Sequence, residues 1–267
     1  MLRREQLDLF ASEHTGFLSD VSPRYLAGPG DARHTTHALA AAGWKVRSDP
    51  LAPVVDLVSP DRLHRLRHEP QTTADDAAWY LRSEGPFEHW YAQFTAIPVE
   101  ILAGLTDRLL PSPAVEPPGV WELLADAGWS RTPRGDAAHS PDSMVSTEHL
   151  QIVRDDPARA WRITVRPDAG EGPLIWSAWI AHEPPPHLVS GLIAALTDTA
   201  PVQRDWSQTE AHYSALRTES RMTPEAYVAA HRTRLDTVGA RVRATRRNAS
   251  PSESTPPLKS APLRQAR

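Results

Sequence analysis

The sequence predicts an α+β fold, a tandem repeat of an α-(4-5 antiparallel β)-α unit followed by a C-terminal amphipathic helix and a disordered tail. Three observations support this prediction. Short landmark segments recur in the same order at nearly one spacing, and in each copy a helical segment ends at a Gly-Trp pair that precedes short strand-like segments. Each copy then closes with a helix that begins at a proline. Helices on either side of such a run of strands are expected to pack on one face of an antiparallel sheet.

Five pairs of matched segments define the repeat, with offsets between 81 and 87 residues. The pairs are 41–44 with 126–129, 59–61 with 140–142, 78–82 with 160–164, 90–92 with 176–178, and 102–105 with 189–192. A nearly constant period is the signature of a duplicated structural unit. We therefore assign residues 22–111 to the first copy and residues 115–205 to the second, after an N-terminal segment of residues 1–21.

The elements of each copy follow from composition and turn signals. The opening helices are expected at residues 34–42 and 120–127, because both segments end at a glycine, Gly43 or Gly128. Strands are expected at 54–58, 63–67, 79–82 and 90–94 in the first copy, and at 150–154, 161–165 and 174–180 in the second. The closing helices are expected after Pro98 and after the three prolines at 184–186, since proline suits the first turn of a helix.

Three pairs of tryptophans occupy matched positions in the two copies. They are Trp44 and Trp129, Trp79 and Trp161, and Trp90 and Trp176. Matched aromatic positions in diverged copies are most simply core anchors, since each side chain buries a large apolar area. We expect all six in the core.

The C-terminal part divides into a helical segment, residues 206–247, and a disordered basic tail, residues 248–267. A helix is expected from Thr223, as its cap, to about Arg247. Its apolar stripe consists of Val228, Leu235, Val238 and Val242, with arginines on either side. This pattern is typical of an amphipathic helix that packs on the body of the protein. Serine, proline and charged residues dominate the tail, which predicts disorder.

Charge is distributed unevenly along the chain. Residues 240–267 carry seven arginines and lysines against one glutamate, a net +6, which leaves −10 for the remaining body. An acidic body argues against binding of duplex DNA by the general surface. The basic tail can bind a polyanion such as nucleic acid, or fold back on the body.

Several classes of protein are disfavoured by composition and motifs. The chain has no cysteine, so it has neither disulfides nor thiolate sites. It lacks a secretory leader and any apolar run long enough to cross a membrane, which predicts a cytoplasmic protein without a membrane partner. No glycine-rich nucleotide motif is present, and we expect no bound cofactor.

The landmarks together are similar to a known family. The segments are Ser-Pro-Arg-Tyr-Leu-Ala-Gly-Pro-Gly-Asp at 22–31, Ala-Gly-Trp at 42–44, Ser-Pro-Asp at 59–61, Trp-Tyr-Ala at 90–92 and the helix after Pro98. Over about residues 22–205 the chain resembles the actinobacterial SPDY domain family, a domain of unknown function named for a Ser-Pro-Asp-Tyr signature and often found in two copies. Both copies keep Ser-Pro-Asp, but Arg62 and Ser143 stand at the tyrosine position. The resemblance implies a repeated domain and assigns no catalytic residue.

The first Ser-Pro-Asp also raises the question of hydrolysis. Ser59, Asp61 and His64 supply the residue types of a nucleophile, an orienting acid and a base. However, strand residues five apart point to opposite faces, and no Gly-x-Ser-x-Gly elbow surrounds the serine. The second copy keeps the motif but has Val145 where His64 stands. We therefore expect a hairpin turn that both copies share.

A metal site is the other enzymatic alternative. His34 and His37 are three apart on an expected helix, and His64 and His68 are four apart on an expected strand, hence on one face. The second copy does not repeat these pairs, and zinc requires three or four converging ligands. We expect no metal, and the enzyme alternative is a hydrolase or nuclease that uses these histidines with Asp61.

The strand alternation predicts the candidate binding surface. If Trp79, Leu81 and Trp90 face the core, the residues between them face the other way. The resulting candidates are Tyr80, Arg82, Tyr91, Arg162, Arg166 and Trp179. Tyrosine, tryptophan and arginine are enriched in protein-binding hot spots, which predicts a non-enzymatic module that binds a protein. The alternatives are single-stranded nucleic acid stacked on the aromatics, packing of the two faces against each other, or a cover by the C-terminal helix.

Overall fold

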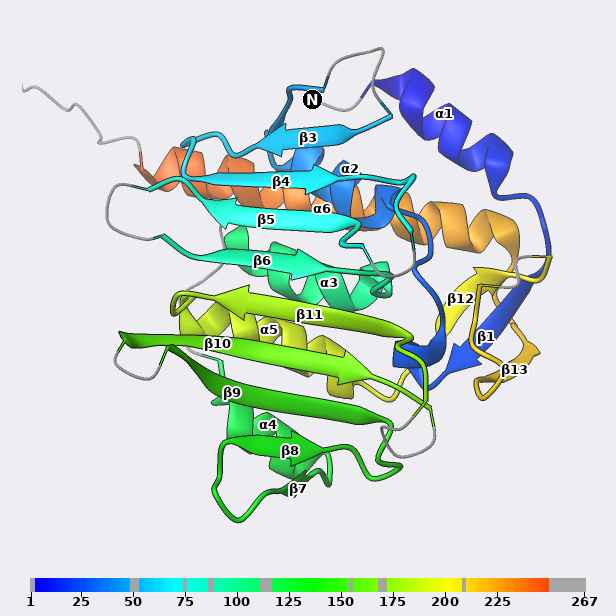
Figure 1. Cartoon of the computed structure of the whole chain (residues 1–267). Coiled ribbons are helices and arrows are strands. Elements are labelled where there is room, and N and C mark those ends of the chain that lie inside the picture. The colour runs from blue at the N-terminus through cyan, green and yellow to red at the C-terminus, as the bar shows by residue number, and fades with distance from the viewer. Residues whose placement is uncertain are drawn as a thin grey trace, which may run out of the picture.

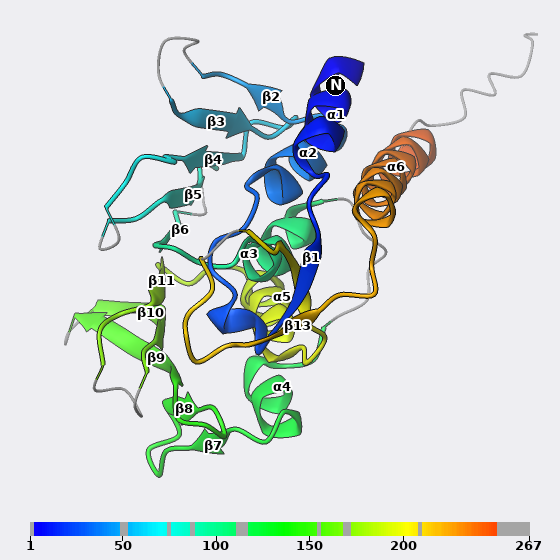
Figure 2. The ribbon, with the colours of Figure 1, turned by 90° about the vertical axis from the view of Figure 1, so that its right-hand side faces the viewer.

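The computed structural model of the chain describes residues 3–48, 53–73, 76–85, 89–110, 117–153, 156–167, 172–207 and 210–249. Ten antiparallel strands form one continuous twisted sheet, and helices cover one of its faces (Figures 1 and 2). The mixed α+β class and the C-terminal helix expected from the sequence are confirmed. The expected tail beyond Ala249 and the expected boundary between the copies, residues 111–115, lie outside the described residues.

The order helix, five strands, helix occurs twice along the chain. The first set comprises α2 (Arg33–Ala41), β2 (Lys45–Val46), β3 (Val55–Val58), β4 (His64–His68), β5 (Trp79–Ser83), β6 (Tyr91–Phe94) and α3 (Val99–Thr106). The second comprises α4 (Val120–Asp126), β7 (Ser130–Arg131), β8 (Ala137–His139), β9 (Val145–Val153), β10 (Asp156–Val165), β11 (Trp176–Ala181) and α5 (Pro186–Thr197). The very short strands β2, β7 and β8 were not predicted, because two or three residues carry no readable alternation.

The two sets join edge to edge. The strand order is β2-β3-β4-β5-β6-β11-β10-β9-β8-β7, so β6 of the first set pairs with β11 of the second. Gln93 lies opposite Trp179 across this junction. Behind the sheet, α3 and α5 cross with Gly104 close to Gly191. The uncovered faces therefore lie side by side, and the alternative in which they pack against each other is wrong.

A single apolar core extends under both halves of the sheet. Trp44, Trp79, Trp90, Trp129 and Trp176 are buried in it, as expected. The exception is Trp161, which is only half-buried. Pairing of β6 with β11 satisfies the backbone groups of two strands that would otherwise be open edges, which accounts for one merged core in place of two.

A smaller sheet ties the chain ends to the main body. It contains β1 (Leu18–Ser22), β12 (Val202–Asp205) and β13 (Leu216–Glu219) in the order β12-β1-β13. The helix α1 (Arg4–Glu13) precedes it, and the short 3-10 helices η1 (Arg24–Leu26) and η2 (Asp107–Leu109) follow β1 and α3. The segment 206–247 is thus not wholly helical, since β13 lies within it. Strands that pair across about 180 residues leave no local signal in the sequence.

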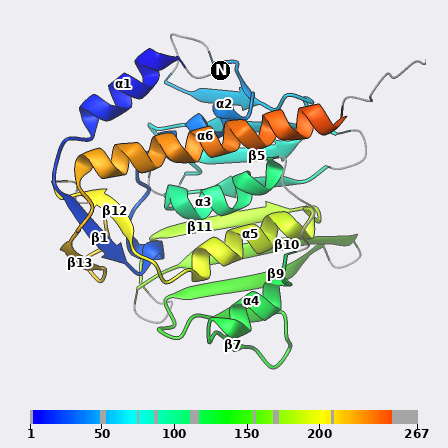
Figure 3. The ribbon, with the colours of Figure 1, turned by 180° about the vertical axis from the view of Figure 1, so that it is seen from behind.

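The C-terminal helix α6 (Pro224–Ala249) packs on α2, on the helical side of the sheet (Figure 3). The backbone N–H of Ala226 donates to the Thr223 hydroxyl at 3.2 Å, which confirms the expected cap. The predicted stripe is buried: Val228, Leu235, Val238 and Val242. The helix does not cover the exposed sheet face, so that alternative is also wrong. Among the described residues, no helix has the length and apolar character needed to cross a bilayer.

Candidate functional site

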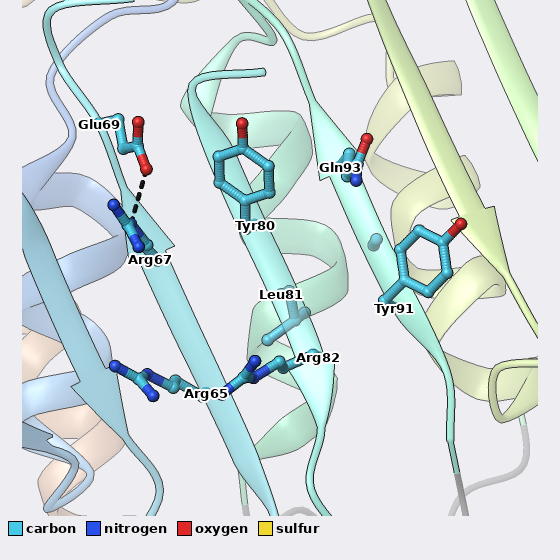
Figure 4. A pocket seen from close by; sticks show the side chains of 9 residues that line it. Arg65, Arg67, Glu69, Tyr80, Leu81, Arg82, Tyr91 and Gln93 are labelled. Atoms are coloured by element: carbon cyan, nitrogen blue, oxygen red, sulfur yellow. Dashed lines mark ion pairs between the residues drawn. The ribbon is translucent and has the colours of Figure 1, made fainter. Parts of the chain in front are cut away.

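The sheet face opposite the helices carries a groove of about 360 Å³ over β4, β5 and β6. Alternation along β5 and β6 buries Trp79, Leu81 and Ala92 and directs Tyr80, Arg82 and Tyr91 to this face, as predicted (Figure 4). The groove is lined by Arg65, Arg67, Glu69, Tyr80, Leu81, Arg82, Tyr91, Ala92 and Gln93. Arg65 and Arg67 were not proposed from the sequence, although the alternation of 64–68 contained the signal.

One row of cross-strand neighbours crosses the junction between the two halves. From β4 to β9 its members are Arg67, Tyr80, Gln93, Trp179, Arg162 and Glu148. Side chains directly opposite each other in an antiparallel pair lie about 5 Å apart. The structure thus brings Tyr80, Trp179 and Arg162 into one row, and Arg82 pairs with Tyr91 in the neighbouring row. Arg166 follows the end of β10 and donates to the carbonyl of Gly172 at 2.9 Å, away from the row.

The arginines of this face are paired with carboxylates. The pairs are Arg65 with Asp56, Arg67 with Glu69, Arg82 with Glu84, and Arg162 with Glu148. Hydrogen bonding to Asp56 raises the pKa of the Arg65 guanidinium. Because each positive charge has a negative neighbour, the face presents polar and aromatic groups with little net charge.

Both Ser-Pro-Asp motifs form the same hairpin turn. The Ser59 hydroxyl donates to Asp61 at 2.5 Å and accepts from the backbone N–H of His64 at 2.9 Å. In the second copy Ser140 donates to Asp142 and accepts from the N–H of Val145 at the same two distances. The turn predicted from the sequence is confirmed.

The fourth motif position has a backbone requirement of its own. Arg62 and Ser143 adopt φ values of 65° and 61°, in the left-handed region that closes the turn. In the second copy the turn has an additional partner from another segment, because the Tyr25 hydroxyl donates to Asp142. Burial, followed by this hydrogen bond, raises the pKa of Tyr25 far above its usual range.

The residues of the hydrolase alternative do not assemble. His34 and His37 lie on α2 beneath α6, whereas the His68 ring stacks on Trp79 at 3.9 Å between centroids. The Ser59 hydroxyl proton is donated to Asp61 rather than to an imidazole. Across the described ranges, no group of three histidine, aspartate or glutamate side chains is placed to hold a metal ion.

The chain ends meet α2 at a buried pair of histidines. His37 Nδ1 and His231 Nε2 are 3.2 Å apart, so one imidazole donates to the other. Phe10 of α1 stacks on His231 at 4.1 Å between ring centroids. Burial lowers the pKa of His37 to about 4 and that of His231 to about 3. Both imidazoles are therefore neutral at pH 7, and they hold α1 and α6 against the body.

These depressed pKa values predict that acid weakens the fold. Between pH 6.5, the ordinary histidine pKa, and about pH 4 the unfolded chain binds the protons that the folded chain excludes. Stability from each histidine is complete above this window and is lost as the pH falls, by about 2 kcal/mol at pH 5. Thermal unfolding at pH 7 and pH 5 measures the loss. His231→Phe, which keeps a ring beside Phe10, should show a smaller difference, and an equal difference would refute the assignment.

A comparison with known protein families finds one family model that matches both repeated segments. The model of the SPDY domain, a domain of unknown function (DUF317), matches residues 58–115 and 139–202. Each match begins beside a Ser-Pro-Asp turn and includes a closing helix, α3 or α5. The resemblance and its occurrence in two copies are thus confirmed. No curated protein and no solved structure matches the chain.

Proposed function

We propose that this chain, with its two SPDY-domain segments, is a non-enzymatic module that binds a protein on the uncovered face of its sheet. The observation that carries this proposal is the row of aromatic and arginine side chains that runs across the junction between the two halves. Tyr80 and Trp179 lie on either side of Gln93 in that row, and Tyr91 pairs with Arg82 beside it. Residues of these types are the ones that most often dominate binding energy at protein interfaces.

The paired charges favour a protein over a nucleic acid. Single-strand binders combine stacking aromatics with a positively charged groove along the phosphate backbone. On this face the guanidinium groups of Arg67 and Arg82 lie within 2.6 Å of Glu69 and Glu84. A phosphate would have to displace these carboxylates, whereas a polypeptide with both donors and acceptors can bind alongside them. Nucleic-acid binding through the basic tail, residues 248–267, is the alternative.

The test is affinity capture from the native host with a triple variant. Tyr80→Ala, Tyr91→Ala and Trp179→Ala together should reduce recovery of the specific partner at least about tenfold, since hot-spot truncations cost about 2 kcal/mol or more. The matched control replaces three exposed aromatic residues elsewhere: Phe17, Trp206 and Tyr213. Partners are identified by mass spectrometry, and binding is then measured with the purified partner.

Two results would contradict the proposal. The first is a triple variant that folds like the parent and keeps every partner. The second is loss of binding in the control variant alone, which would move the interface to the small sheet. Binding of single-stranded oligonucleotides that falls steeply with salt and disappears without residues 248–267 would instead support the nucleic-acid alternative.

A further inference from the structure

A second cavity lies on the helical side of the sheet, in the second copy. Its volume is about 620 Å³, within the range of small-molecule sites. It lies between β9, β10, α4 and the start of α5. Its lining includes Val120, His149, Arg159, Trp161, Glu183 and Val189. The cavity and the groove over β4, β5 and β6 lie on opposite faces of the sheet, so the two sites can be tested independently.

Trp161 forms a fixed aromatic wall of this cavity. The imidazole of His149 stacks on it at 4.3 Å between centroids with an interplanar angle of 10°. The indole of Trp121 from α4 contacts it at a tilt, 5.3 Å between centroids. Burial lowers the pKa of His149, so its ring is neutral at pH 7. A ring held in place by two aromatic neighbours is preorganised for contact with a planar ligand.

The tryptophan at the equivalent position of the first copy is buried. There His68 stacks on Trp79 in the same cross-strand arrangement. Trp79 is 3% exposed, whereas its counterpart Trp161 is only partly buried and lines the cavity. The helix layer also differs between the two copies. α2 has nine residues and is covered by α6, whereas α4 has seven and no described helix lies over it (Figure 3).

The chain leading into α5 carries a second difference between the copies. From Trp90 to Pro98, which caps α3, there are eight steps along the chain, and from Trp176 to Pro185, which caps α5, there are nine. The longer connection contains His182 and Glu183, with φ values of 61° and 53°. Two consecutive non-glycine residues in the left-handed region are uncommon and cost free energy, and such outliers concentrate at binding sites. Here the unusual backbone brings Glu183 to the cavity wall.

Opposite charges therefore line an aromatic cavity. Arg159 comes from β10, two residues before Trp161 and on the same face of the strand. Within the described part of the chain neither Arg159 nor Glu183 forms an ion pair, in contrast to the paired arginines of the outer face. Near His149 the charge of Arg159 outweighs that of Glu183. The guanidinium is thus available to an anion, and the carboxylate to a donor.

We infer that this cavity binds a small planar aromatic carboxylate. Its ring stacks against Trp161, its carboxylate accepts hydrogen bonds from Arg159, and an N–H of the ring donates to Glu183. The planar guanidinium of an arginine can donate two parallel hydrogen bonds to the two oxygens of one carboxylate, which favours a carboxylate over other acceptors.

Calorimetric titration of the full chain with indole-3-acetate, which has a planar ring, a ring N–H and a carboxylate, tests the inference. We expect saturable binding with one site per chain. Arg159→Gln should weaken it about tenfold or more, because a charge-assisted hydrogen bond is lost. Trp161→Phe, which keeps an aromatic face, should change it by less than about threefold. Arg4→Gln, on α1 with its side chain 94% exposed and outside both sites, is the matched control and should leave affinity unchanged.

Three outcomes would overturn the inference. The first is no saturable binding of indole-3-acetate at millimolar concentration. The second is equal binding to the parent and to Arg159→Gln. The third is tighter binding of tryptamine, which has the same ring with an ammonium group and would reverse the charge preference. None of these results bears on the outer face, whose Tyr80, Tyr91 and Trp179 lie across the sheet from the cavity.

Discussion

Gly104→Ala should destabilise the protein by about 3 kcal/mol, at the upper end of the cost of overpacking a core. α3 and α5 cross at Gly104 and Gly191, and a Cβ on Gly104 would lie 2.4 Å from the carbonyl oxygen of Gly191. It would also lie 2.5 Å from Cβ of Ala195. Neither obstacle is the end of a flexible side chain. Relief of the clash therefore requires the two helices, and with them the two halves of the core, to separate.

Gly239→Ala is the matched control for this prediction. Gly239 lies inside α6, and a Cβ there would meet only the guanidinium end of Arg243, at 3.2 Å. Alanine is favoured over glycine inside a helix by about 1 kcal/mol, so this variant should gain stability. Urea unfolding of both variants measures the two shifts. If Gly104→Ala unfolds within 0.5 kcal/mol of the parent, with its m-value unchanged, the helix crossing does not hold the halves together.

The contact between Gly104 and Gly191 could be predicted only in part from the sequence. Gly104 and Gly191 belong to matched segments of the repeat, so their equivalence is readable from the sequence. Their contact is not readable, because it depends on which strand edges of the two copies meet. Alternation assigns Tyr80 and Trp179 to an outer face with no reference to that choice. It therefore predicted the faces correctly, while the merged sheet that aligns the two residues came only from the structure.

The cavity of the second copy was missed for a related reason. Trp161 matches Trp79, and a matched position in a repeat predicts the same environment. The helix layer behind the sheet differs between the copies. Of the two opening helices, α2 packs against α6, whereas α4 lies away from it (Figure 3). The local signals were the additional residue before α5 and the charged Glu183 beside it. These two features indicate a cavity only when the structures of the two copies are compared.

The largest single-residue loss of stability is expected at Arg204 of β12. Its guanidinium is 4% exposed and binds Glu100 of α3 through two hydrogen bonds of 2.7 and 2.8 Å. It also donates to the carbonyls of Ala27 and Gly28, and so joins the small sheet to the main core. Arg204→Met leaves a buried carboxylate and two carbonyls without donors. Removal of one partner of a buried ion pair costs about 3–5 kcal/mol.

Two further variants separate the loss of the ion pair from the loss of side-chain volume. Arg162→Met breaks the pair with Glu148, in which the arginine is 46% exposed, and should change stability by less than about 1 kcal/mol. Arg204→Met combined with Glu100→Leu removes both charges and should recover part of the loss, because no unpaired carboxylate remains buried. Urea unfolding at pH 7 compares all three with the parent. If the double variant is no more stable than Arg204→Met alone, the deficit comes from the lost contacts with Ala27 and Gly28, and the role of Arg204 is to anchor the N-terminal segment rather than to neutralise Glu100.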